Sequence, residues 1–174
     1  MKNEDITPYF KKGLISKIVE TELQRYLNFF EQSYKENRDC AEYLTETFPR
    51  WSMIAGYYAM HDLTKLFLAK QFLIKVELRV HKTTVELMQI ICKDKELLSL
   101  LQSGYEEFLK MANDLAEAKQ ERIKAQYYTG SEFMKGKYKE KAAQFVKEIV
   151  RPYLKKLGNL MKEELEETNE SKSL

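Results

Sequence analysis

Five side chains in this sequence combine types and spacings that suit the binding of an anion and a nucleotide base. His81 and Lys82 lie where a helix is expected to begin, and free N–H groups at a helix start attract anions. Arg122 precedes Tyr127 and Tyr128 near the expected end of another helix. Arginine clamps phosphate with paired hydrogen bonds, and tyrosine stacks on a base or donates to it. These residues are the predicted ligand-binding set if the fold brings the two segments together.

Each of these residues also has a purely structural explanation. Lys75, Arg79, His81 and Lys82 can form a charged loop that simply faces water. Arg122 can bridge a neighbouring carboxylate while the tyrosines pack at a helix end. The sequence alone leaves both interpretations open.

His61 lies inside an apolar helix, directly after two tyrosines, an alanine and a methionine. It is either a core histidine whose ring nitrogen is satisfied by a neighbour, or a pocket residue that bonds a ligand or a partner subunit. Asp62 follows it, but consecutive helical residues point in different directions and are not automatically a pair.

The sequence offers few residues for metal or nucleophilic catalysis. It has two histidines and neither a Glu-x-x-His pair nor a His-Glu-x-x-His motif. A Gly-x-Ser-x-Gly elbow and a glycine-rich phosphate loop are also missing. Cys40 and Cys92 are far apart, which predicts two buried thiols in a reducing cytosol. We therefore predict no catalytic residue, no metal and no cofactor.

The composition predicts one helical domain. Leu, Lys, Glu and Ala dominate the 174 residues, with few glycines and prolines, so we expect an all-α protein with one domain over 1–168 and a polar tail over 169–174. The 29 basic and 27 acidic residues nearly balance, so only a local patch can attract nucleic acid. The N-terminus is unlike a signal peptide, and no apolar run approaches the roughly 20 residues of a membrane span. A cytoplasmic protein with no membrane association is expected.

Apolar residues at three- and four-residue steps predict the helices. The first is expected from about Pro8 or Gly13 to Tyr34, with a shorter piece capped by Asn37 or Asp39 and ending at Leu44. Phe48-Pro49 should break the chain. The next helix, from near Arg50 to Gln71 or Phe72, is apolar on most sides and should be the central one.

The remaining segments complete a bundle. Alternating apolar residues in 73–82 suit a strand, but because no partner strand is evident we expect an extended connection. Thr83 or Thr84 should cap a helix through Cys92, and Asp94 should cap the next, which Gly104 ends or bends before a long helix over 105–128. A last helix is expected over 132–166, kinked or divided at Pro152. The pattern predicts an antiparallel up-and-down bundle of four to five long helices.

These motifs together resemble the HEPN domain. The resemblance covers roughly 14–157 and rests on one apolar helix, the start of the helix after it, and an arginine shortly before a tyrosine: Tyr57, Tyr58, Ala59, Met60, Leu63, Phe67, Leu68, His81, Lys82, Arg122, Tyr127 and Tyr128. It implies an up-and-down helical bundle that is often a homodimer, is associated with nucleotide binding and is found in prokaryotes. It also implies a nucleotidyltransferase as partner in a toxin–antitoxin pair.

One branch of that family consists of metal-independent ribonucleases, which use an arginine followed after four to six residues by a histidine. In this sequence, positions 127 to 129 read Tyr, Tyr and Thr. A tyrosine, with a pKa near about 10, replaces poorly an imidazole that titrates near neutral pH. The chain therefore resembles the non-nuclease branch, and we expect a non-catalytic nucleotide- or RNA-binding module.

Two alternatives stay open. The first is an atypical ribonuclease in which His61 or His81 approaches Arg122 across the fold or across a dimer. The second is a protein-interaction scaffold that presents exposed aromatic residues, for which the candidates are Phe29, Tyr34, Phe133 and Tyr138.

Overall fold

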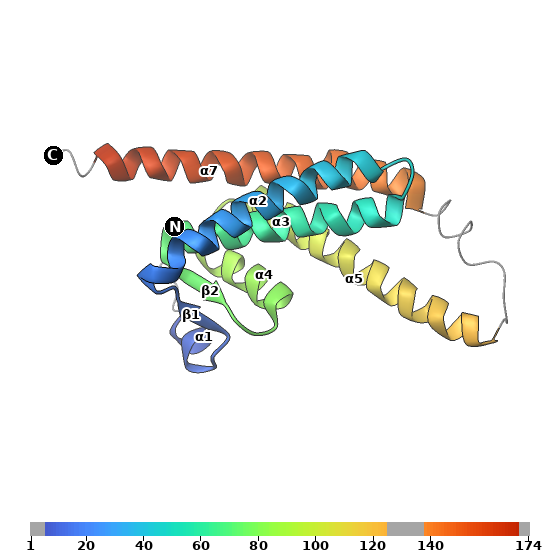
Figure 1. Ribbon diagram of the computed structural model, residues 1–174, viewed down its shortest axis with the longest axis horizontal. Coiled ribbons are helices and arrows are strands. Elements are labelled where there is room, and N and C mark those ends of the chain that lie inside the picture. The colour runs from blue at the N-terminus through green and yellow to red at the C-terminus, as the bar shows by residue number, and fades with distance from the viewer. Residues whose placement is uncertain (1–5, 125–137, 171–174) are drawn as a thin grey trace.

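The computed structural model describes residues 6–124 and 138–170 and shows a helical bundle with one small sheet (Figure 1). The prediction of an all-α bundle is confirmed. A helix over 138–144 runs directly into η1, a π-helical segment, and then into α7. The elements, in chain order, are α1 (Thr7–Lys11), β1 (Ile15–Lys17), α2 (Glu20–Leu44), α3 (Pro49–Phe72), β2 (Ile74–Val76), α4 (Val80–Ile91), α5 (Lys95–Lys124), η1 (Phe145–Val150) and α7 (Arg151–Glu170).

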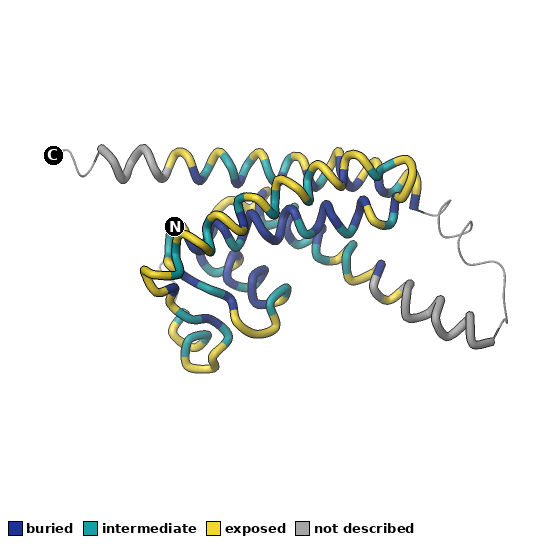
Figure 2. Tube along the Cα trace, in the orientation of Figure 1, coloured by how far each residue is buried: buried dark blue, intermediate teal, exposed yellow. Residues whose placement is uncertain are grey.

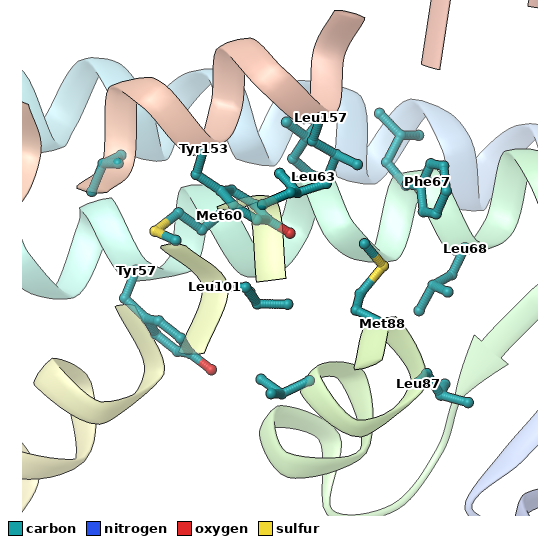
Figure 3. Packing of buried hydrophobic residues seen from close by; sticks show 14 of the residues in the cluster. Tyr57, Met60, Leu63, Phe67, Leu68, Leu87, Met88, Leu101, Tyr153 and Leu157 are labelled. Atoms are coloured by element: carbon teal, nitrogen blue, oxygen red, sulfur yellow. The ribbon is translucent and has the colours of Figure 1, made fainter. Parts of the chain in front are cut away.

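Helix α3 is the centre of the bundle, as its apolar sequence predicts. It contacts α2, α4, α5, η1 and α7, and most of its residues are buried (Figure 2). Its side chains meet residues from three neighbouring helices (Figure 3), namely Leu87 and Met88 of α4, Leu101 of α5, and Tyr153 and Leu157 of α7. A helix that is apolar on all sides is stable only when it is surrounded in this way.

Helix α2 is one continuous helix rather than two pieces, so the prediction of a second start at Asn37 or Asp39 is wrong. The Asn37 amide donates to Asp62 of α3 at 3.0 Å instead of capping its own helix. The predicted start near Pro8 or Gly13 is also wrong, because a short helix and a strand precede Glu20. The break at Phe48-Pro49 is confirmed, with Pro49 as the first residue of α3.

The segment after α3 is a strand, so the expected extended connection is corrected. β2 pairs antiparallel with β1, with Ile15 opposite Val76 and Lys17 opposite Ile74. Ile15, Ile74 and Val76 are buried, which explains the alternation of apolar residues in β2. The sequence did not predict the partner strand, because the apolar residues of that segment were interpreted as part of a helix.

Helix α4 begins at Val80, earlier than predicted, and neither Thr83 nor Thr84 caps it. The Thr83 hydroxyl donates to the Leu78 carbonyl at 2.8 Å, and the Thr84 hydroxyl donates to the Val80 carbonyl at 2.7 Å. The Asp94 cap of α5 is confirmed, because its Oδ1 atom accepts the N–H groups of residues 96 and 97 at 3.0 Å each.

Helix α5 passes through Gly104 without a break, and the reason for the glycine is packing. A Cβ atom at this position would lie 2.7 Å from Cε of Met60. Gly56 of α3 is equally crowded, since a Cβ atom there would lie 2.9 Å from Cγ2 of Val150 and 3.2 Å from Cε1 of Phe145. Both glycines let α3 approach its neighbours closely.

Pro152 neither breaks nor ends the last helix. Proline lacks an N–H group and its ring clashes with the carbonyl four residues earlier, so an ordinary α-helical turn before it is strained. The six residues Phe145–Val150 form a π-helical segment immediately upstream. Such wider turns are a known cause of local helix distortion. The helix is therefore not divided at Pro152 as predicted, and the π-helical segment η1 precedes the proline instead.

The structure also tests the predictions about exposed aromatic residues, the two cysteines and membrane-spanning helices. Phe29 is exposed as expected, but Tyr138 is completely buried, so its predicted exposure is wrong. Cys92 is buried, whereas Cys40 is exposed, which corrects the expectation of two buried thiols. In the parts of the chain that the structure describes, no helix is both long and apolar enough to cross a membrane.

Replacing Gly56 with valine should destabilise the protein by about 1–3 kcal/mol, because the added methyl groups overpack the contact with Val150 and Phe145. Gly158 is the matched control, since no atom lies within 4 Å of its Cβ position. Gly158→Ala should raise stability by about 0.5–1 kcal/mol through helix propensity alone. Urea unfolding followed by circular dichroism measures both changes, and equal stability of Gly56→Val and the wild type would contradict the packing account.

Candidate functional site

The predicted ligand residue His81 is hydrogen-bonded to a tyrosine of the central helix. The Tyr57 hydroxyl of α3 lies 3.0 Å from Nδ1 of His81, the second residue of α4. Burial, followed by the neighbouring His61, lowers the pKa of His81 to about 4. Burial also raises the pKa of Tyr57 well above its ordinary value. Both groups are therefore neutral near neutral pH, and the tautomer of His81 decides whether the Tyr57 hydroxyl or the Nδ1–H group is the donor.

His61 lies one helical turn after Tyr57, and its ring centroid is 4.7 Å from that of His81. Its side chain is buried, in agreement with the core interpretation. Nε2 of His61 lies 3.4 Å from the Thr84 hydroxyl, whose own proton goes to the Val80 carbonyl. Thr84 therefore accepts from Nε2, while Nδ1 makes no hydrogen bond and lies 3.6 Å from Oδ1 of Asp62.

The Asp62 carboxylate is buried and is held by two residues of α2. Ser33 Oγ donates to Oδ2 of Asp62 at 2.6 Å, and Asn37 Nδ2 donates to the same oxygen at 3.0 Å. A buried carboxylate is costly unless hydrogen bonds compensate it. This carboxylate and the two histidines therefore form a polar connection from α2 through α3 to α4.

Aromatic rings enclose the two imidazoles, and we call the set Tyr57, Tyr58, His61, His81 and Phe108 the imidazole–tyrosine cluster. Phe108 of α5 stacks on Tyr57, with ring centroids 4.3 Å apart and planes 17° from parallel. Phe108 also lies 5.3 Å from the His81 ring, and Tyr58 lies 5.6 Å from it. Because a general base needs a pKa near the working pH, His81 in this setting is suited to packing and hydrogen bonding rather than to proton transfer.

The predicted cationic cluster at the start of α4 is largely neutralised. Lys82 is exposed and lies 3.6 Å from Glu86, and Lys75 lies 3.4 Å from Glu77. Arg79, which precedes α4, is exposed and has a left-handed backbone with φ 50°. Exposed lysines next to carboxylates attract an additional anion only weakly.

The other predicted ligand residues are separated from His81 or lie outside the described residues. Arg122 belongs to α5 and follows Phe108 by 14 residues, which corresponds to about 21 Å along the helix axis. Figure 1 shows this end of α5 running away from the bundle. Tyr127 and Tyr128 lie outside the described residues. Within one chain, the backbone of Arg122 is therefore remote from the cluster that contains His61 and His81.

A second candidate site lies between α2 and α7, and it was not predicted from the sequence. This α2–α7 groove has a volume of about 280 Å³. Three basic residues and one tyrosine surround an apolar floor, and the full lining is Tyr34, Arg38, Leu63, Arg151, Leu154, Lys155 and Gly158. Cations beside an aromatic ring provide contacts both for a phosphate and for a base.

The groove carries a small excess of positive charge. Nε of Arg38 donates to Asp39 at 2.8 Å, and Nε of Arg151 donates to Glu42 at 2.9 Å. Lys155 is exposed and makes no ion pair within the described residues. Since each guanidinium has five N–H donors, both arginines retain donors for a further anion.

A weak signal for the groove was present in the sequence. Tyr34 and Arg38 are four residues apart, as are Arg151 and Lys155, so each pair shares a helix face. Nothing in the sequence indicated that these two faces meet, because they are more than a hundred residues apart. In the described part of the chain, no three His, Cys, Asp or Glu side chains gather in a way that could hold a metal ion.

Comparison with known proteins gives no further guide to the site, because no family model, curated protein or solved structure matches this chain.

The lowered pKa of His81 predicts that stability falls as the pH falls from about 6.5 to about 4. In this window the unfolded chain binds a proton at His81 that the folded chain does not, so acid favours unfolding. His81→Gln keeps an acceptor for Tyr57 but cannot titrate, and its stability curve should be flatter over the same window. Urea unfolding of both proteins across this pH range checks the difference, and two parallel curves would contradict it.

Proposed function

We propose that this chain is a HEPN-like, non-catalytic nucleotide- or RNA-binding module whose ligand lies in the α2–α7 groove. The observation that carries the proposal is the presence of three basic side chains and one tyrosine around a single apolar floor. Arg38 and Arg151 offer paired donors to phosphate oxygens, and Tyr34 offers a face for a base. The groove also supplies the local basic patch that binding requires in a chain with a net charge of only +2.

The groove offers an anion three cationic side chains, whereas the start of α4 offers Arg79 and Lys82. His81 is neutral and its Nδ1 atom is occupied by Tyr57, while Lys82 lies beside Glu86. In the groove, Lys155 has no acidic partner within the described residues, and the two arginines keep free donors. The roles of His81, Lys82, Arg122, Tyr127 and Tyr128 in ligand binding stay predictions.

A non-catalytic role is also in keeping with the chemistry of the imidazole–tyrosine cluster. His61 is buried, and His81 has a pKa of about 4 and bonds Tyr57. Neither imidazole lies next to the backbone of Arg122 in the same chain. The arginine–histidine pairing of metal-independent ribonucleases has no counterpart among these residues.

The proposal includes self-association and a nucleotidyltransferase partner, as the resemblance implies. Exposed aromatic residues around the turn between α2 and α3 support a protein contact there. Tyr43 is 84% exposed, Phe48 59% and Trp51 53%, and all three follow one another closely in the chain. Apolar groups gathered on a surface are typical of interaction sites.

Ligand binding is tested by the thermal midpoint of unfolding in the presence of ATP and of short RNAs. A ligand that binds only the folded state raises this midpoint with concentration. The double variant Arg38→Gln/Lys155→Gln should weaken binding by at least about tenfold, because it removes two cations from the groove. The exposed pair Lys11→Gln/Arg25→Gln removes the same charge elsewhere and should bind like the wild type.

A flat response to every nucleotide and RNA would contradict the proposed function. A response lost in His81→Gln/Lys82→Gln but kept in the groove variant would place the ligand at the start of α4 instead.

Self-association is tested by light scattering over a range of concentrations. The wild type should form a dimer, and Phe48→Ser/Trp51→Ser should shift the equilibrium toward monomer because it removes exposed apolar surface. Leu109→Ser, at an apolar position on α5 that is 41% exposed, is the control and should leave the dimer intact. A wild-type protein that is monomeric at all concentrations would contradict this part of the proposal.

A further inference from the structure

We infer that the α2–α7 groove takes a single nucleotide, with its base on the Tyr34 ring beside Gly158 and its phosphate between Arg38 and Lys155. This inference rests on the proposed nucleotide-binding function and adds the class of ligand and its orientation.

The order of residues along the groove follows from one contact between the two helices. Figure 1 shows α2 and α7 running in opposite directions, with α2 inclined to α7 so that the two helices separate toward the N-terminal end of α2. The Arg151–Glu42 hydrogen bond of 2.9 Å joins them at one end of the groove. Starting from this bond, one helical turn along the groove goes back about four residues in α2 and forward about four residues in α7. Each such step covers about 6 Å. Counted from this bond, Arg38 and Lys155 lie one turn along their helices and Tyr34 and Gly158 about two turns, and all four line the groove.

Gly158 leaves open space beside the tyrosine. No atom lies within 4 Å of the position that a Cβ atom would occupy there. Glycine weakens a helix relative to alanine, so a glycine inside a helix usually has a packing reason. Gly56 and Gly104 have such a reason in their close contacts with Val150 and Met60, whereas Gly158 has none among the described residues. Space reserved for a ligand explains this glycine.

Tyr34 is suited to hold a base in that space. Its side chain is half-buried and packs against the hydrophobic core, so its ring is fixed in position. The Lys35 amine lies over the ring at 5.9 Å from its centroid, so a base would stack on the other face. Stacking of a base on an aromatic ring is a common source of affinity in nucleotide and single-strand recognition.

Phosphate contacts would come from the next helical turn. Arg38 bonds Asp39 through one edge of its guanidinium and keeps further N–H donors. Lys155 has no acidic partner within the described residues. About 6 Å along the helix separates this pair of cations from Tyr34, which matches the reach from a base to its 5′-phosphate.

The dimensions favour one nucleotide over a strand. A volume of about 280 Å³ lies just below the range of about 300–1,000 Å³ that is typical of small-molecule sites. The Arg151–Glu42 bond crosses from α7 to α2 beside the groove. A single tyrosine lines the groove, whereas sites for single strands stack several bases in succession.

Isothermal titration with AMP, UMP and inorganic phosphate tests the inference on the full chain. Gly158→Leu should weaken AMP and UMP at least about tenfold by filling the base position, and should leave phosphate binding unchanged. Lys155→Gln should weaken all three ligands. Tyr34→Leu should weaken only the nucleotides, and Tyr34→Phe should restore them because phenylalanine still stacks. Circular dichroism verifies that each variant keeps its helices.

The outcomes separate the inference from the function on which it rests. Equal nucleotide affinity of wild type and Gly158→Leu, together with a loss in Lys155→Gln, would overturn the base position while nucleotide binding stands. A short single-stranded RNA that occupies several nucleotides per chain and binds far more tightly than AMP would overturn the single-nucleotide class. No binding of any nucleotide or RNA to the wild type would overturn both.

Discussion

The constraint on which this structure depends is the burial of α3 on every side. A helix with no polar face cannot lie at a surface, so other elements must surround it. In this chain α2, α4, α5, η1 and α7 do so, and two glycines reduce the distance at which they pack. The two-stranded sheet and η1 are consequences of the same requirement. The sheet buries Ile15 and Ile74 near the end of α3, and the π-helical segment keeps Phe145 and Val150 against α3 although Pro152 follows.

The polar residues inside this apolar environment are a second consequence. Asp62, His61 and Thr84 have almost no access to water, so each must find partners within the protein. The bonds from Ser33 and Asn37 to Asp62, and from Tyr57 to His81, join α2 and α4 to the same two turns of α3. Such bonds are directional, so they fix the register of the helices more specifically than apolar contacts do. Each histidine has one hydrogen-bond partner in this interior, Thr84 for His61 and Tyr57 for His81.

The sequence predicted the parts of the fold that local patterns determine. The apolar stripes identified the helices, Pro49 marked the start of α3, and Asp94 was correctly placed as the cap of α5. The sequence did not predict the parts of the fold that depend on a residue far away in the chain. The strand at Ile74 was rejected because its partner at Ile15 lies far upstream, and Asn37 was taken as a cap although it bonds Asp62 of another helix. The α2–α7 groove was missed for the same reason, since Tyr34 and Lys155 are brought together only by folding.

The groove also follows from the burial of α3. α2 and α7 cover neighbouring parts of α3, and Leu63 of α3 lies at the bottom of the groove between them. Long basic side chains at the groove edge have apolar stems that cover the floor and charged ends that face water. A basic rim can therefore arise simply because it covers apolar surface. A rim of this kind would need no open space behind it. Gly158 leaves part of this rim open, because a Cβ atom there would meet no atom of another element within 4 Å, and it does so at a cost in helix stability. This open position lies along the same groove as Tyr34 and Lys155, which is why the proposed ligand is placed there.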